Sequence, residues 1–259
     1  MNKLKVEDII KKKGFEKITS LTAYDYITAK ILDEAGIDIV LVGDSLSNVI
    51  QGNRTTIPVS MDEMLYHCKI VSNAIKRSLV IGDMPFMSYQ ISLKDGIRNA
   101  MRFLKEGNCD GVKIEGGYEI LELVNKLTVY GVPVMGHIGL MPQRVNLYGY
   151  NLAKDEELVN IAKKLEEAGV FSIVLEKVEY KLAKKITESI NIPTIGIASG
   201  PYCDGQVLVF HDMVGLTQTK FKFVRKYLNA YELFTNAVKN YIQDVKLGNF
   251  PSLEESYEG

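Results

Sequence analysis

The chain has 259 residues, of which 46% are hydrophobic and 24% are charged, a composition that is ordinary for a water-soluble globular protein. Its formal net charge of −1 provides no overall attraction to nucleic acid or to a charged membrane surface. Three cysteines without zinc or disulfide spacing suit a reducing compartment. No apolar run approaches the ~20 residues of a membrane span, so we expect a cytoplasmic protein that binds neither nucleic acid nor membrane.

Eight apolar, β-branched runs alternate with longer amphipathic segments along the chain. Runs such as Ile-Val-Leu-Val at 39–42 are unbroken, which is typical of parallel strands that are buried on both faces. The eight predicted strands lie at 18–24, 37–45, 78–85, 110–116, 133–140, 171–178, 192–200 and 205–213.

Helical patterns separate most of these strands. The predicted helices lie at 28–35, 61–77, 93–106, 118–130 and 155–168. Four of them end at a glycine, which supplies the left-handed conformation that often closes a helix. We also predict an N-terminal helix within 1–14 and one long helical segment over 221–247, followed by a loose acidic tail at 251–259.

Strands alternating with helices over this length predict a single α/β domain spanning 1–259, folded as a (β/α)8 TIM barrel. An open doubly wound sheet is the alternative. The link between the seventh and eighth strands is too short for a crossover helix, which fits the barrel less well than the other connections do.

Ionisable residues follow the apolar runs of the second to sixth strands, where barrel enzymes carry their catalytic groups. A single Asp after a strand is more often a turn former, and a single His is more often a core residue. Charges on five neighbouring strands are harder to explain structurally, because buried unpaired charges are destabilising. A cation and an anionic substrate would offset that effect. The residues are Asp44, Asp83, Lys113, Glu115, His137 and Glu176.

The carboxylates among these residues indicate a metal site. Asp44, Asp83 and Glu115 form an all-oxygen set, which Mg²⁺ prefers, and without a cation they would repel one another. Lys113 and Glu115 are two apart, so they share one face of their strand, and a simple ion pair inside the barrel is the alternative.

Two further features leave alternatives open. Glu176 follows the apolar run 171–175, a desolvating setting that suits a general base, although it could instead pair with Lys177. The glycines at 196, 200 and 205 could cradle a phosphate or could simply form tight turns.

At these positions the chain resembles the ketopantoate hydroxymethyltransferase family, and the resemblance spans essentially the whole length. The ordered motifs are TSLTAYD (19–25), LVGDSL (41–46), DMPFMSY (83–89), VKIEGG (112–117), GHIGLMPQ (136–143), IVLE (173–176) and CDGQVLV (203–209), with further likeness at 221–226 and 250–251.

The resemblance implies a barrel enzyme that forms a homodecamer and uses Mg²⁺ or a similar ion. It implies transfer of a hydroxymethyl group from methylene-tetrahydrofolate to α-ketoisovalerate, giving ketopantoate for pantothenate synthesis. Asp44 and Asp83 match its metal ligands, with Glu115 a direct or water-mediated third, and Glu176 matches its general base. The matching substrate-binding residues are Asp44, Ser45, Asp83, Lys113 and His137.

The chain departs from the family in loops near the mouth of the expected barrel. The family's usual Gly-Ile-Gly-Ala-Gly is here Gly-Ile-Ala-Ser-Gly at 196–200, and the segments 52–55 and 150–155 also differ. These departures bear on folate binding, for which no residues are assigned. Two rival functions are an isocitrate lyase or phosphoenolpyruvate mutase type of barrel enzyme and a non-catalytic barrel. Lyases of the first type usually carry a catalytic Cys motif, which this chain lacks. A non-catalytic barrel would have lost the site carboxylates, which this chain retains.

Overall fold

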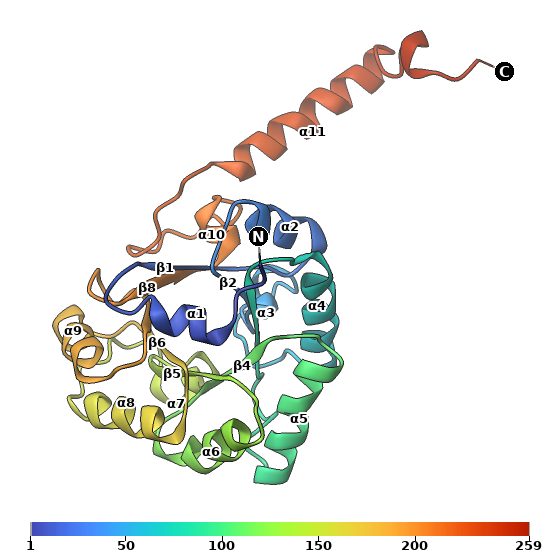
Figure 1. The fold of residues 1–259 in the computed structure, drawn as a ribbon. Helices are drawn as coiled ribbons and strands as arrows, with labels where there is room; N and C mark the ends of the chain where they lie inside the picture. The colour runs from blue at the N-terminus through green and yellow to red at the C-terminus, as the bar shows by residue number, and fades with distance from the viewer. Residues whose placement is uncertain (1, 259) are drawn as a thin grey trace. The chain divides into compact units, whose positions relative to one another are not determined.

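The computed structural model describes residues 2–258, which form two compact units that divide between Val209 and Phe210. The first unit is a closed barrel in which parallel strands pair in chain order and β8 pairs with β1 (Figure 1). Because the sheet closes on itself, the TIM-barrel prediction is confirmed and the open sheet is excluded. The strands are β1 (Ile18–Thr22), β2 (Ile39–Val42), β3 (Leu79–Asp83), β4 (Gly111–Glu115), β5 (Val134–Gly139), β6 (Ser172–Glu176), β7 (Thr194–Ile197) and β8 (Gly205–Leu208).

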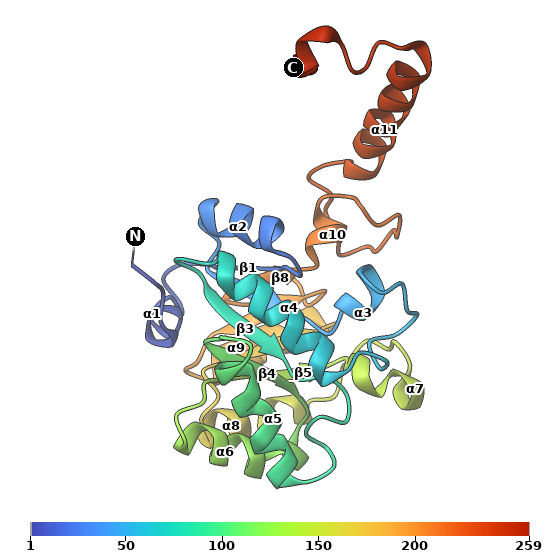
Figure 2. The same cartoon turned by 90° about the vertical axis from the view of Figure 1, so that its right-hand side faces the viewer.

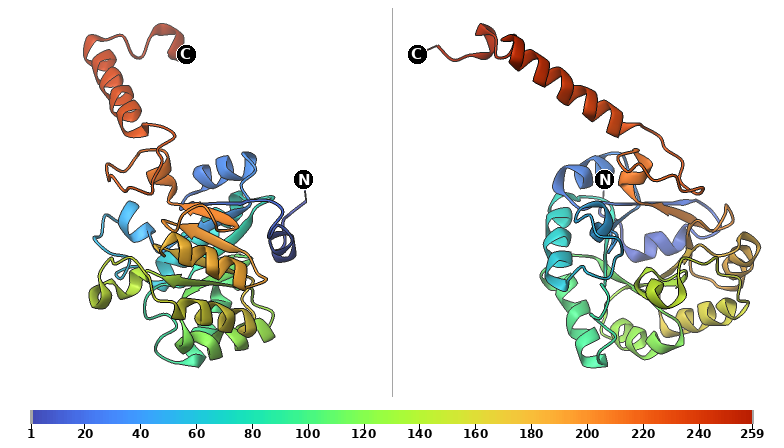
Figure 3. Two further views of the ribbon diagram at one scale, coloured as in Figure 1. Left: turned by 90° about the vertical axis from the view of Figure 1, so that its left-hand side faces the viewer. Right: turned by 180° about the vertical axis from the view of Figure 1, so that it is seen from behind.

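Helices surround the barrel on its outside (Figure 3). They begin at recognisable caps: the side chain of Asp25 accepts from the N–H of Thr28, and Ser60 forms a capping box with Glu63. The helix at Tyr180–Ser189 was not predicted from the sequence; it ends at Ile190 without a closing glycine. The outer helices are α2 (Tyr26–Glu34), α4 (Met61–Ala74), α5 (Leu93–Lys105), α6 (Leu121–Val129, preceded by the 3-10 turn η1, Tyr118–Ile120), α8 (Glu157–Ala168) and α9 (Tyr180–Ser189).

Helix α1 (Val6–Lys11) closes the N-terminal end of the barrel. Its Ile9 is fully buried and belongs to an interior apolar cluster that includes side chains from seven strands. Figure 2 shows α1 at one end and the short helices α3 (Leu46–Val49) and α7 (Val145–Tyr148) at the opposite end, which is the carboxyl end of the strands. The apolar interior members are Ile9, Ile18, Ile39, Leu41, Leu79, Ile81, Met135, Phe171, Val174, Ile195 and Val207.

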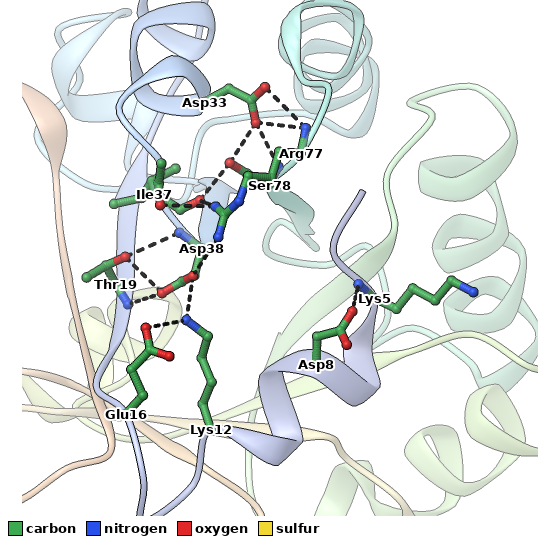
Figure 4. A network of polar contacts seen from close by, with 11 residues as sticks. Lys5, Asp8, Lys12, Glu16, Thr19, Asp33, Ile37, Asp38, Arg77 and Ser78 are labelled. Carbon is green, nitrogen blue, oxygen red and sulfur yellow. Dashed lines mark hydrogen bonds and ion pairs between the residues drawn. The ribbon is translucent and has the colours of Figure 1, made fainter. Parts of the chain in front are cut away.

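A polar network secures the N-terminal ends of the strands (Figure 4). The Asp33 carboxylate accepts from the backbone N–H groups of Lys76, Arg77 and Ser78 and from the Ser78 hydroxyl. Those hydrogen bonds hold the pKa of Asp33 below its ordinary value, although burial acts in the opposite direction. Asp33 therefore joins the end of α2 to the start of β3.

The second unit contains α10 (Phe210–Met213), α11 (Ala230–Leu247) and the 3-10 turn η3 (Leu253–Glu255). The predicted helix over 221–247 begins only at Ala230, and the predicted eighth strand ends at Leu208. The backbone N–H groups of Tyr227 and Ala230 donate to the carbonyls of Met213 and Val214, which diverts the chain from helical bonding. No helix within 2–258 is long and apolar enough to cross a bilayer.

Candidate active site

The predicted site residues of β3, β4 and β5 meet on the interior face of the barrel. The strand register pairs Asp83 with Lys113 and Glu115 with His137. Lys113 and Glu115 both enter the interior because alternate residues share a face. Lys113 Nζ lies 2.7 Å from Asp83 Oδ1, so the ion pair joins adjacent strands instead of two residues of one strand.

Asp44 follows β2 and completes a cluster of three buried carboxyl groups. Its backbone N–H donates to Asp83 Oδ2 over 3.0 Å. Burial, and then the charge of Asp83, raise the pKa of Asp44 to about 7. Burial, and then the charge of Asp44, raise the pKa of Glu115 well above its ordinary range. The charged forms of Asp44 and Glu115 are therefore destabilised by burial and by the neighbouring carboxylates.

Lys113 supplies positive charge to this cluster. Burial alone would lower its pKa, but the carboxylates of Asp83, Asp44 and Glu115 raise the pKa above its ordinary value. The ammonium therefore stays charged inside the barrel. Because three carboxyl groups face a single ammonium, the acidic groups outnumber the positive charge, and an additional cation could balance them.

His137 lies between Lys113 and Glu176. Its Nδ1 is 3.3 Å from Lys113 Nζ, and its Nε2 is 3.3 Å from Glu176 Oε2. Burial, and then the charge of Lys113, lower the pKa of His137, so its ring is neutral near pH 7. An ammonium can only donate, so Nδ1 accepts and we assign the ring proton to Nε2, facing Glu176.

Glu176 ends β6 at the carboxyl edge of the barrel. It is the most exposed of the ionisable site residues, with 22% of its side chain accessible against 2% for His137. Lys177 instead directs its ammonium to the backbone carbonyl of Tyr150. Glu176 therefore faces His137 instead of its chain neighbour, and a substrate can reach it.

Ser45 stands beside Asp44 at the start of α3. Its hydroxyl lies 2.8 Å from the hydroxyl of Tyr24, a buried residue that follows β1. The structure thus brings all the predicted site residues to the carboxyl end of β2 to β6.

Gln143, which the sequence reasoning did not single out, links the acidic cluster. Its backbone N–H donates to Glu115 Oε1 over 3.0 Å, and its side-chain amide donates to Asp44 Oδ2 over 3.1 Å. The Tyr89 hydroxyl lies 3.0 Å from Gln143 Oε1. The only sequence signal for Gln143 and Tyr89 was their place in the family motifs.

The glycines after β7 pack against protein. A Cβ on Gly200 would lie 2.6 Å from the Cβ of Tyr180, and one on Gly205 would lie 2.5 Å from the carbonyl oxygen of Ile18. Close packing therefore accounts for these two glycines without a phosphate. Immediately before Gly200, Ala198 adopts a left-handed φ of 55° and Ser199 is buried.

The acidic cluster has a chemical composition that suits a divalent cation. The described residues contain no ready-made group of three His, Cys, Asp or Glu side chains with metal spacing. Yet Glu115 Oε2 is buried without a hydrogen-bond partner, at 3.7 Å from His137 Nδ1. An orphaned carboxylate oxygen amid excess acid is the environment that a hard cation satisfies. The donor set of Asp44, Asp83 and Glu115 therefore fits Mg²⁺ or a similar ion.

A family model described as ketopantoate hydroxymethyltransferase matches residues 3–253. The chain belongs to this family. A 3-methyl-2-oxobutanoate hydroxymethyltransferase of Chlorobaculum tepidum is 51% identical, over 96% of this chain and 93% of the relative. One of Clostridium kluyveri is 52% identical, over 94% of this chain and 89% of the relative. Family membership makes the chain an enzyme of the hydroxymethyltransferase type.

Solved structures share the fold. A 2,3-dimethylmalate lyase of the PEP mutase/isocitrate lyase superfamily aligns with a TM-score of 0.63 at 14% identity, covering 98% of this chain and 91% of the lyase. A phosphonopyruvate hydrolase in complex with oxalate and Mg²⁺ aligns at 0.65 and 12% identity, covering 98% of this chain and 93% of the hydrolase. At such identities the likeness concerns the barrel alone.

Proposed function

We propose that the enzyme transfers a hydroxymethyl group from methylene-tetrahydrofolate to α-ketoisovalerate, giving ketopantoate for pantothenate biosynthesis. The relatives' names support the substrate, because 3-methyl-2-oxobutanoate is α-ketoisovalerate, and the family description names the product, ketopantoate. The observation that supports this chemistry is the approach of Glu176 Oε2 to within 3.3 Å of His137 Nε2, because Glu176 is then a carboxylate close to the acidic cluster. Proton abstraction from C3 of the keto acid would create the carbon nucleophile.

We propose that Asp44, Asp83 and Glu115 hold Mg²⁺ or a similar divalent ion. When bound, such a cation supplies stabilisation of the negative charge that develops on the keto oxygen during enolisation. Asp44 and Asp83 come from successive strands, and Glu115 offers an oxygen with no hydrogen bond. The buried setting strengthens these electrostatic interactions.

The chain's own residues have complementary roles in this proposal. Glu176 removes the C3 proton, and the His137 Nε2–H keeps the Glu176 carboxylate turned toward the site. Lys113 stays charged and offers an ammonium to the anionic keto acid, with the Ser45 hydroxyl as a further polar contact. The enolate carbon then forms a C–C bond to the methylene carbon of the folate, and water supplies the hydroxyl oxygen. Both bonds from that carbon to the folate nitrogens break, and the nitrogens take up the C3 proton and one proton of the water, which releases tetrahydrofolate.

A direct test combines the purified chain with α-ketoisovalerate, methylene-tetrahydrofolate and Mg²⁺ and follows the products by mass spectrometry. We expect ketopantoate and tetrahydrofolate in equal amounts. Turnover of other keto acids without any ketopantoate would contradict the assigned substrate.

We further propose that the enzyme is cytoplasmic and assembles into a homo-oligomer, specifically a homodecamer. The family resemblance supports the oligomer, and so do large apolar side chains on α11 that have about half of their surface exposed. Examples are Tyr231, Leu233 and Phe234. Light scattering at micromolar concentration tests it, and a monomeric mass would contradict it.

A further inference from the structure

Gln143 occupies the 3-10 turn η2 (Pro142–Arg144), which follows β5 at the carboxyl end of the barrel. It is 3% exposed, so its amide must find partners within the protein. Its Nε2 donates to Asp44 Oδ2 over 3.1 Å and to the carbonyl of Met84 over 3.0 Å. Its Oε1 accepts from Tyr89 Oη over 3.0 Å and from Gln90 Nε2 over 3.1 Å.

These contacts use both amide protons and both lone pairs of the Gln143 side chain. The amide therefore has one orientation, because a flipped amide would place its oxygen against the Asp44 carboxylate and the Met84 carbonyl, which accepts and cannot donate. A side chain with every polar atom engaged is held rigidly, and it can hold its partners in turn.

Gln143 also contacts the second carboxylate of the cluster through its backbone. Its N–H donates to Glu115 Oε1 over 3.0 Å, while Glu115 Oε2 stays without a hydrogen bond. One residue thus binds one oxygen of Asp44 and one oxygen of Glu115, although these acids belong to different strands. Its donors are neutral, so they orient the carboxylates without cancelling the negative charge that a cation needs.

We propose that Gln143 is a positioning residue that fixes Asp44 and Glu115 in the orientation that binds the divalent cation. The inference rests on the metal site of the proposed function. Gln143 contacts the acids and not the reacting atoms, so its removal weakens cation binding more than it slows proton abstraction at saturating cation.

Two substitutions of Gln143 test this role. Gln143→Met keeps the length of the side chain and loses all four of its hydrogen bonds. Gln143→Asn keeps an amide that is one methylene too short to reach Asp44 and Tyr89 together, and it provides a second variant if the first folds poorly. Gln90→Leu is the matched control, because Gln90 bonds the same Oε1 but contacts neither carboxylate. Retained near-ultraviolet circular dichroism verifies that each variant is folded.

The readouts are Mg²⁺ affinity by calorimetry and the maximal rate of C3 proton exchange at saturating Mg²⁺. Removing a partner that orients a metal ligand typically weakens metal binding by about 10–100-fold, and we expect this in both Gln143 variants. We expect Gln90→Leu to change the affinity by less than about threefold, and maximal exchange in the Gln143 variants to stay within about threefold of wild type.

Unchanged Mg²⁺ affinity in both Gln143 variants would overturn the inference while leaving the metal site intact. An equal loss of affinity in Gln90→Leu would also overturn it, because the effect would then reflect the packing of this loop. Absence of Mg²⁺ binding by the wild-type chain would overturn the metal site itself, and the role of Gln143 with it.

Discussion

His137 Nε2 lies 3.3 Å from Glu176 Oε2, while Nδ1 of the same ring lies 3.3 Å from Lys113 Nζ. A neutral imidazole thus bridges the positive charge of the site and its proposed base. The Nε2 contact is close without being a well-aligned hydrogen bond. Such contacts in the absence of substrate often tighten when the substrate binds.

The first prediction concerns this bridge. His137→Asn removes the donor that faces Glu176, and because misplaced catalytic groups lose up to about 100-fold in rate, we expect C3 exchange to fall by about 10–100-fold. Mg²⁺ affinity by calorimetry should stay near the wild-type value. His137→Gln, whose amide nitrogen reaches nearly as far as Nε2, should recover part of the rate. Equal exchange in Asn, Gln and wild-type proteins would show that His137 does not position the base.

The second prediction concerns the metal ligands. We expect Asp44→Asn and Asp83→Asn each to weaken Mg²⁺ binding by at least about tenfold, because each removes a charged oxygen ligand. Chelation by EDTA should abolish exchange in the wild-type protein, and added Mg²⁺ should restore it. Asp62→Asn is the control, since Asp62 is exposed and pairs with Arg102 outside the site. Calorimetric affinities that match wild type in both site variants would refute the assignment.

Much of this site was predictable from strand parity and barrel topology. Lys113 and Glu115 had to share a face because they are two residues apart on one strand. The partner of Lys113 was not predictable, because the pairing with Asp83 depends on the register between β3 and β4. Gln143 was beyond sequence reasoning because its contacts join a loop to side chains of other strands.

The fold was predictable for a related reason. Unbroken apolar runs identified the barrel strands, and each of the eight contains an observed strand. Helix α9 was missed although it buries Leu182, Ala183 and Ile186, because it ends at Ile190 in extended conformation, without the glycine that closes four of the predicted helices. The start of α11 was misplaced because hydrogen bonds from Tyr227 and Ala230 to distant carbonyls override the helical pattern.

The third prediction concerns stability at low pH. Asp33 has a folded-state pKa below its unfolded value, so its contribution is complete above about pH 4 and is lost as the pH falls through the folded pKa. We expect Asp33→Asn to lower the free energy of unfolding at pH 7 by about 1–3 kcal/mol. The gap from wild type, measured by urea unfolding at fixed protein concentration, should narrow toward pH 3.

Glu34→Gln is the control for Asp33, because Glu34 is exposed on the same helix and only approaches Lys30. Its stability should follow wild type at every pH. A gap between wild type and Asp33→Asn that is constant from pH 7 to pH 3 would rule out a depressed pKa at Asp33.

The fourth prediction concerns the departure from the family pattern after β7. The buried Ser199 hydroxyl donates to the Leu175 carbonyl and accepts from the Val178 N–H, which ties both sides of Glu176 to β7. We expect Ser199→Ala to lower the free energy of unfolding by about 1–3 kcal/mol, because buried groups lose their partners. Adding Ala198→Gly should recover up to about 1 kcal/mol, since Ala198 has a left-handed backbone.

Urea unfolding of the single and double variants checks this prediction. Wild-type stability of Ser199→Ala would contradict it, as would a further loss of stability on adding Ala198→Gly.

The fifth prediction separates enolisation from one-carbon transfer, and it tests the central assignment of Glu176. Proton abstraction needs the keto acid, the cation and the base, so wild-type protein with Mg²⁺ should exchange the C3 proton of α-ketoisovalerate for deuterium without folate. The decisive measurement compares this exchange rate, followed by NMR, between wild type and Glu176→Gln. Loss of a general base typically slows a reaction by about 10²–10⁴-fold, so we expect a decrease of that order with Mg²⁺ affinity unchanged. Exchange at the wild-type rate in Glu176→Gln would contradict the account and would move the search for the base to Lys113 or His137.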